Sequence, residues 1–87
     1  MVLDERLLSV LVCPIDKGAL LYFAVDAVLY NPRLRRVYRV ESGIPLMRAD
    51  QAQPVEPDHH TRLLRRAPAE AGTTLDLPVA HLLASAE

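Results

Sequence analysis

The stretch "VLVCPIDKGAL", residues 10–20, holds the only cysteine of the chain and decides how the N-terminal half folds. Cys13 and Pro14, followed by a lysine and Gly18, have the spacing of a zinc knuckle, a tight turn that presents two thiolates to a metal. The position of the second thiolate is occupied by Asp16. Pro14 ends any preceding helix, and Gly18 accepts positive φ. The stretch therefore predicts a turn between an N-terminal helix and a first strand.

Composition and charge limit what this chain can be. It has 87 residues, a formal net charge of −1 and 51% hydrophobic residues, which is typical of one small folded domain. A domain of this length buries only about 60–65% of the surface of its unfolded chain, so we expect a thin stability margin. One cysteine excludes an intramolecular disulfide, and the near-neutral charge gives no general attraction to nucleic acid.

The sequence predicts neither a membrane span nor an export signal. No apolar run reaches the roughly 18 residues that cross a bilayer. Asp4 and Glu5 precede the first apolar stretch, where a signal peptide would carry basic residues. We therefore expect a cytoplasmic protein with a reduced thiol.

The fold class expected from the first half of the chain is small α+β, with an N-terminal helix and a small antiparallel β-sheet. Leucines at helical spacing predict a helix over residues 4–12. Aromatic and β-branched residues predict two strands, 19–24 and 27–31, joined by a tight turn around Asp26. A single helix over both segments is the alternative.

Two further strands are expected before residue 50. Residues 33–40 alternate imperfectly between apolar and polar, and a bulge near Arg35 and Arg36 would reconcile the pattern. Residues 44–47 read as a short strand, which Pro45 confines to an edge or to its first position. The expected core candidates are Leu7, Leu8, Leu11, Leu20, Tyr22, Val28, Tyr30, Tyr38, Ile44 and Leu46.

The second half of the chain has a different character. We expect a ribbon-like domain at 1–50, followed at 51–87 by a linker and a C-terminal tail that is flexible or partly helical. Residues 59–67 are compatible with two turns of helix capped by Asp58, and "PAEAGTT" is expected to interrupt that helix.

Two blocks of residues resemble a known family. The first block is Leu7, Leu8, Cys13, Pro14, Gly18 and Leu20, and the second is Tyr38, Val40, Gly43, Ile44, Pro45, Leu46 and Met47. Their order and spacing are similar to a small zinc-ribbon family, which includes Trm-type activator subunits of SAM-dependent methyltransferases and short bacterial relatives of the YcaR type. The resemblance implies a ribbon of the rubredoxin or zinc-ribbon kind and a role as a small partner subunit.

The zinc ligands of that family are mostly replaced in this chain. Cys13 is retained, whereas the other three ligand positions fall on Asp16, Asn31 and Leu34. Asparagine is a poor zinc ligand and leucine is none, so we expect a metal-free ribbon without a cofactor. Rescue by a histidine of the tail is left open. Cys13 is then expected to be a packed, buried remnant, and Asp16 an ordinary turn residue.

The resemblance also indicates a surface for a protein partner. Activator subunits of the family are understood to extend a methyltransferase sheet through an exposed strand edge. The matching edge is formed by Ile44, Pro45, Leu46 and Met47. The alternative is that these residues only close the small core, or that the apolar tail covers them and mediates self-association.

A basic cluster provides the alternative function. Arg33, Arg35, Arg36 and Arg39 fall within seven positions and would suit RNA phosphates, although a solvated strand face is the favoured interpretation. Cys13 has no nearby histidine to activate it, and the chain lacks a glycine-rich phosphate loop. The leading hypothesis is therefore a non-catalytic accessory protein that stabilises or activates a partner, plausibly a SAM-dependent methyltransferase.

Overall fold

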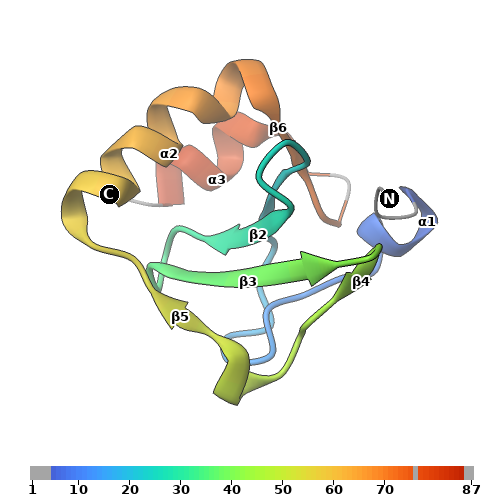
Figure 1. The fold of residues 1–87 in the computed structure, drawn as a ribbon. Helices are drawn as coiled ribbons and strands as arrows, with labels where there is room; N and C mark the ends of the chain where they lie inside the picture. Colours follow the sequence, from blue (N-terminus) through green and yellow to red (C-terminus); the bar gives the residue numbers. More distant parts are fainter. Residues whose placement is uncertain (1–4, 76, 86–87) are drawn as a thin grey trace.

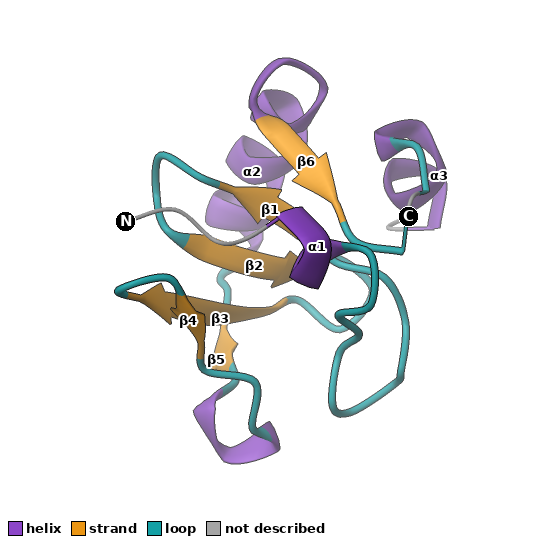
Figure 2. Cartoon of the chain, turned by 90° about the vertical axis from the view of Figure 1, so that its right-hand side faces the viewer, coloured by secondary structure: helices purple, strands orange, loops and turns teal. Residues whose placement is uncertain are grey.

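A computed structural model describes residues 5–75 and 77–85, and it has the expected class of fold (Figures 1 and 2). Neighbouring strands are antiparallel throughout, in the order β4-β3-β2-β1-β6, with β5 also paired to β3. The elements are α1 (Glu5–Leu8), β1 (Leu21–Phe23), β2 (Val28–Asn31), β3 (Arg36–Glu41), β4 (Ile44–Pro45), a 3₁₀ turn (Ala49–Gln51), β5 (Gln53–Pro54), α2 (Pro57–Glu70), β6 (Ala71–Thr73) and α3 (Val79–Ser85). The prediction of a small α+β fold with an N-terminal helix is confirmed, although α1 ends at Leu8 and does not reach residue 12 as the leucine spacing predicted.

The first hairpin agrees with the prediction of strands rather than a helix. β1 pairs with β2 in a register that places Tyr22 opposite Leu29. The chain reverses between the two strands in a turn that contains Asp26, where Ala27 has a φ of 54°. Aromatic and β-branched side chains fit the pleated surface of such a hairpin better than a helix face.

The expected bulge in the third strand is absent, because β3 begins only at Arg36. Residues 32–35 form a turn, in which Arg35 has a φ of 54°. From that point the alternation is regular, with Tyr38 and Val40 buried on one face and Arg39 exposed on the other. Leu34 therefore belongs to a turn, and it is not part of the apolar–polar alternation of β3.

Strand β4 follows β3 through a tight two-residue turn. Ser42 and Gly43 have φ values of 52° and 77°, the positive pair that a type I′ hairpin requires. β4 forms one end of the sheet path, and among the described residues its ladder partner is β3.

The C-terminal segment packs into the fold, where a flexible tail was one expectation. α2 and α3 lie together over one face of the sheet (Figure 1), and β6 pairs with β1. α2 continues through Pro68, so the predicted interruption is wrong; the helix is held by Leu63 and Ala67, which are buried in the core. The division into units at residue 50 stays a prediction.

Both faces of the sheet carry a core. On the helix side, buried residues of β1 and β2 pack with those of α2 and α3; on the other side, the segment around Cys13 and Leu20 packs with Tyr38. Of the expected core residues, Leu7 and Ile44 are wrong, because their exposed fractions are 42% and 64%. The buried members are Leu20, Tyr22, Tyr30 and Tyr38.

Candidate functional site

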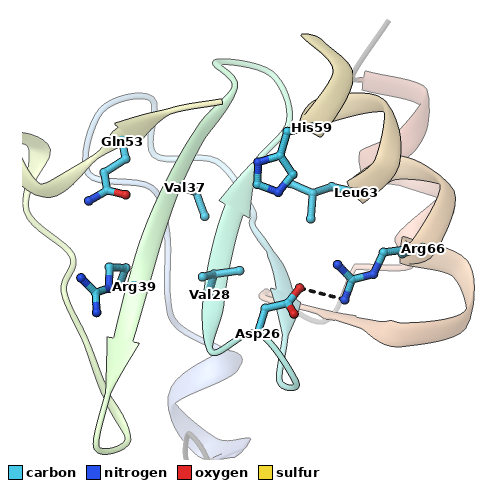
Figure 3. Close-up of a pocket in the computed structure, with 8 residues that line it drawn as sticks. All are labelled: Asp26, Val28, Val37, Arg39, Gln53, His59, Leu63 and Arg66. Carbon is cyan, nitrogen blue, oxygen red and sulfur yellow. Dashed lines mark ion pairs between the residues drawn. The ribbon is translucent and has the colours of Figure 1, made fainter. Parts of the chain in front are cut away.

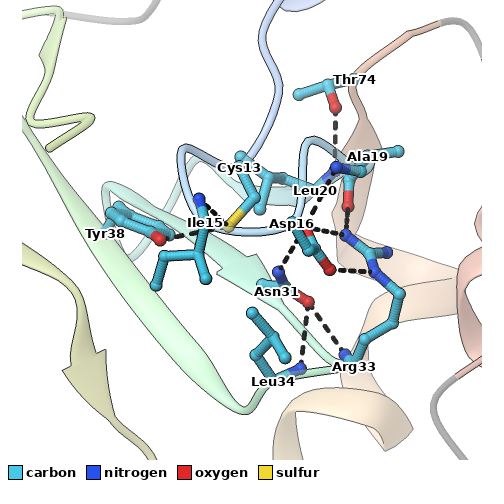
Figure 4. A network of polar contacts seen from close by, with 11 residues as sticks. Cys13, Ile15, Asp16, Ala19, Leu20, Asn31, Arg33, Leu34, Tyr38 and Thr74 are labelled. Carbon is cyan, nitrogen blue, oxygen red and sulfur yellow. Dashed lines mark hydrogen bonds and ion pairs between the residues drawn. The ribbon is translucent and has the colours of Figure 1, made fainter. Parts of the chain in front are cut away.

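The loop that contains Cys13 is a tight turn (Figure 4). The Lys17 amide donates to the Cys13 carbonyl, and the Cys13 amide donates to the Gly18 carbonyl, both at 2.9 Å. The Ile15 amide points at the Cys13 sulfur, with 3.4 Å between N and Sγ. We call residues 13–18 the first loop.

The second loop, residues 31–34, is organised by an asparagine side chain. Asn31 is fully buried, and its Oδ1 accepts hydrogen bonds from the backbone amides of Arg33 (2.9 Å) and Leu34 (3.2 Å). This is a local side-chain turn of the kind that asparagine favours. Leu34 contributes its backbone amide there, while its side chain remains 37% exposed.

Three side chains join the two loops, and we call Asp16, Asn31 and Arg33 the loop junction (Figure 4). The Asp16 carboxylate accepts from Arg33 Nε at 2.8 Å and Nη2 at 3.3 Å, and from Asn31 Nδ2 at 3.2 Å. Arg33 Nη2 also donates to the Ala19 carbonyl at 2.8 Å. Asp16 is therefore more than the ordinary turn residue that the sequence predicted.

The junction is electrostatically favourable for an ionised carboxylate. The hydrogen bond from Arg33 outweighs desolvation and, with the Gly18 amide and Asn31, holds the pKa of Asp16 well below its usual range. The side chains of Asp16 and Arg33 are only 25% and 24% exposed, so this pair is less screened by water than a fully exposed one.

The glycine of the first loop has a different role from the one predicted. Positive φ falls on Lys17, at 60°, and not on Gly18. A Cβ atom at Gly18 would lie 2.4 Å from Arg33 Nη2. Glycine at this position therefore permits the close approach of the guanidinium that joins the two loops.

The residues at the four ligand positions do not fit a zinc ion. The oxygens of Asp16 and Asn31 already accept hydrogen bonds, and Leu34 has no side-chain donor atom for a metal. Cys13 is fully buried, as predicted, and its sulfur lies 3.2 Å from the Tyr38 hydroxyl. Within residues 5–75 and 77–85, no group of three or more His, Cys, Asp or Glu side chains is arranged to hold a metal.

His59 and His60 of α2 lie on the helix side of the sheet, opposite the core around Cys13. His60 is buried on the helix side, where its Nδ1 lies 2.5 Å from the Tyr30 hydroxyl. Burial is the main cause that lowers the pKa of His60 below its ordinary value, and Arg35 adds to it. The same burial raises the pKa of Tyr30 to about 12. His59, also on α2, lines a pocket between that helix and the sheet.

The predicted partner-binding residues lie at the end of the sheet. Ile44 is 64% exposed, whereas Pro45, Leu46 and Met47 are half-buried. The Leu46 amide donates to the Arg39 carbonyl at 2.9 Å, and Met47 packs against the core around Cys13. This segment therefore combines an exposed apolar side chain with an edge position, and its role in binding stays a prediction.

The predicted basic cluster is divided among different contacts. Arg33 belongs to the loop junction, and Arg36 Nη1 donates at 3.3 Å to the carbonyls of Leu34 and Arg35. Arg39 Nη2 lies 3.3 Å from a Glu41 carboxylate oxygen. Nucleic-acid binding through these residues stays a prediction, and three of the four guanidinium groups have intramolecular acceptors.

Sequence reasoning missed Thr74, which attaches the C-terminal segment to the chain just after the first loop. Thr74 is fully buried; its hydroxyl accepts from the Leu20 amide at 2.8 Å, and its own amide donates to the Leu20 carbonyl at 3.0 Å. The two residues are 54 positions apart, and no local pattern signals a contact over that distance.

Comparisons with known proteins agree with the geometry. The family model described as Trm112p-like protein matches residues 4–43. A UPF0434 protein of Gluconobacter oxydans is 41% identical over 54 residues, which are 62% of this chain and 92% of that protein. A UPF0434 protein of Gluconacetobacter diazotrophicus is 43% identical over 54 residues, 62% of this chain and 86% of that protein. The solution NMR structure of an uncharacterized BCR protein is 46% identical, with a TM-score of 0.55, and the match covers 66% of this chain and 93% of that chain.

The fold and the loops define a small α+β protein with an antiparallel sheet, in which polar side chains join the first and second loops. The chain belongs to the Trm112p-like (UPF0434) family. That family consists of small proteins and is not a known catalytic one. Over residues 5–75 and 77–85, no helix has the length and apolar character needed to cross a bilayer.

Proposed function

We propose that this chain is a non-catalytic accessory protein that binds a SAM-dependent methyltransferase and stabilises or activates it through the β4 edge. Membership of the Trm112p-like family supports a role as a small partner protein. The observation that carries the proposal is Ile44, an apolar side chain that is 64% exposed on a strand at the end of the sheet.

The backbone of the β4 segment favours strand addition from one side. Leu46 directs its amide toward β3, where it bonds the Arg39 carbonyl. Because strand residues alternate, Pro45 and Met47 direct their backbone groups away from β3. Proline has no N–H, so a partner strand would bond the Pro45 carbonyl and both backbone groups of Met47.

The chemistry of the buried thiol supports a non-catalytic role. A nucleophilic cysteine needs access to substrate and a base that takes its proton. Cys13 is fully buried, and its near polar neighbours are the Tyr38 hydroxyl and the Ile15 amide. Neither of these groups is a general base for a thiol at neutral pH.

The test is affinity capture from the native host with the wild-type chain, Ile44→Lys and Gly72→Lys. Gly72 lies on β6, the opposite edge strand, and has open space where a side chain would start, so it is a matched control. We expect the wild type and Gly72→Lys to recover one methyltransferase, and Ile44→Lys to lose it. Adding purified chain should increase the methyl transfer of that enzyme.

Two outcomes contradict the proposal. Recovery of no methyltransferase with a stable wild-type chain rejects the partner class. Loss of the partner in Gly72→Lys, with retention in Ile44→Lys, moves the interface to the β6 edge and away from β4.

A further inference from the structure

The helix side of the sheet is only partly covered, and the uncovered part forms a pocket of about 410 Å³ (Figure 3). Its apolar wall is formed by Val28 and Val37 of the sheet and by Leu63 of α2. The two valines, on β2 and β3, are half-buried, since α2 contacts the sheet mainly through β1 and β6. The volume lies within the range of about 300–1,000 Å³ that is typical of small-molecule sites.

One arginine of the pocket is fixed by its own partners. Arg66 bonds Asp26 at 2.8 Å and forms two bonds with Glu70, at 3.1 and 3.0 Å. Its guanidinium also lies over the Phe23 ring, 5.3 Å from the centroid. Arg66 therefore forms a rigid wall whose charge is already compensated.

The second arginine is much less constrained. Arg39 and its partner Glu41 are 60% and 55% exposed, and their closest N···O distance is 3.3 Å. Exposed pairs of this kind contribute little, because water screens them. The Arg39 guanidinium is consequently able to exchange Glu41 for a carboxylate of a ligand, which it binds through two parallel hydrogen bonds.

We propose that this pocket binds a small carboxylate that carries a branched or aromatic apolar group. The apolar group packs on the valines and Leu63, and the carboxylate pairs with Arg39. Arg66 is already paired with Asp26 and Glu70, so the cation of the lining that is available to an anionic ligand is Arg39. The donors of Gln53 and His59 lie on the same pocket and add polar contacts at its rim.

The pocket does not include the residues of the proposed β4 interface, and half of its lining lies outside the family match. Gln53, His59, Leu63 and Arg66 lie beyond residue 43, where the match to the family model ends. The C-terminal segment thus provides half of the lining and gives this chain a concave site.

The experiment is an NMR titration of the full chain with 4-methylpentanoate and its uncharged amide. We expect the acid to shift the backbone signals of Val28, Val37 and Leu63 in a saturable way, and the amide to leave them nearly unchanged. N-acetyl-L-leucine distinguishes the source of the ligand: tighter binding than the free acid assigns the C-terminal residue of a peptide, and equal or weaker binding assigns a free acid.

Arg39→Gln should weaken binding about tenfold or more, the effect of losing a hydrogen bond between charged groups. The matched control is Arg48→Gln, because Arg48 also forms an exposed ion pair, with Asp50 at 3.0 Å, but lies outside the pocket lining. Absence of saturable shifts in the wild type overturns the proposal. So does equal binding of the amide, or unchanged affinity in Arg39→Gln.

Discussion

Replacing Asp16 by asparagine tests whether the loop junction holds the two loops together. The substitution keeps the size of the side chain and removes its charge. The Gly18 amide, which donates to Asp16 Oδ1 at 3.0 Å, retains an acceptor. Arg33 loses an ionised partner at 2.8 Å and faces an amide that brings N–H donors of its own.

The magnitude follows from the exposure of the pair. Exposed ion pairs are worth about 0–1 kcal/mol, and breaking a fully buried pair costs about 3–5 kcal/mol. Asp16 and Arg33 are about a quarter exposed, which places the junction between these limits. Asn31 also loses a charged acceptor for its Nδ2. We expect Asp16→Asn to lower the free energy of unfolding by about 2 kcal/mol at pH 7.

Thermal unfolding measures this loss. For a domain of this size, 1 kcal/mol corresponds to about 4–8 °C, so Tm should fall by about 8–16 °C. The control is Asp50→Asn, which removes an ion pair whose side chains are 60% (Asp50) and 76% (Arg48) exposed and should lower Tm by no more than about 4–8 °C. Equal effects of the two substitutions would refute the structural role of the junction.

Acidification provides an independent check on the same carboxylate. The pKa of Asp16 is lower in the folded chain than its value of 3.8 in the unfolded chain. The unfolded state therefore takes up the proton first, and the stability that the charge provides is lost as pH falls below about 4. The difference in Tm between wild type and Asp16→Asn should shrink over that range.

Three further predictions concern the rest of the fold. The pKa of His60 is lower in the folded chain than in the unfolded chain, so the free energy of unfolding should fall as pH decreases through about 6.5. Thermal unfolding between pH 7.5 and 5.5 measures this dependence, and His60→Gln should flatten it. Gly18→Ala should cost about 1–2 kcal/mol in urea unfolding, since the methyl group displaces Arg33, whereas Gly72→Ala should cost nothing measurable. A chain cut to residues 1–50 lacks β6 and the two helices, α2 and α3, that contribute to the helix-side core. It should show no cooperative thermal unfolding by circular dichroism. Cooperative unfolding with unchanged Tm would instead support a separate folding unit at the N-terminus.

The strands were predictable where the information was local. The β1–β2 hairpin combines aromatic and β-branched residues with a polar turn, and Ser42-Gly43 marks the next reversal. The attachment of the C-terminal segment was not predictable, since β6 pairs with β1 through residues such as Leu21 and Thr73, which are far apart in the chain. Pro68 added to the error, because buried contacts of α2 override the low helix propensity of a single proline.

The loop junction shows what a motif reveals and what it leaves out. The spacing around Cys13 identified the first loop and the family resemblance identified the second, but Asp16 was described as a turn residue and Arg33 was placed in a basic cluster. Opposite charges in two loops that a resemblance brings together are a signal for an ion pair, and that signal was present in the sequence. The close approach at Gly18 depends on the guanidinium position, which only the three-dimensional structure provides.

The way in which the two loops are held together has a consequence for stability. The free energy of binding a structural zinc adds directly to the free energy of folding, whereas a carboxylate paired with a guanidinium adds only a few kcal/mol. The C-terminal segment adds buried surface through Leu63, Ala67 and Leu82, and Thr74 bonds both backbone groups of Leu20 directly after the first loop. Stability in this chain is therefore distributed between the loop junction and the helix-side core, which is why variants in both regions are needed to account for it.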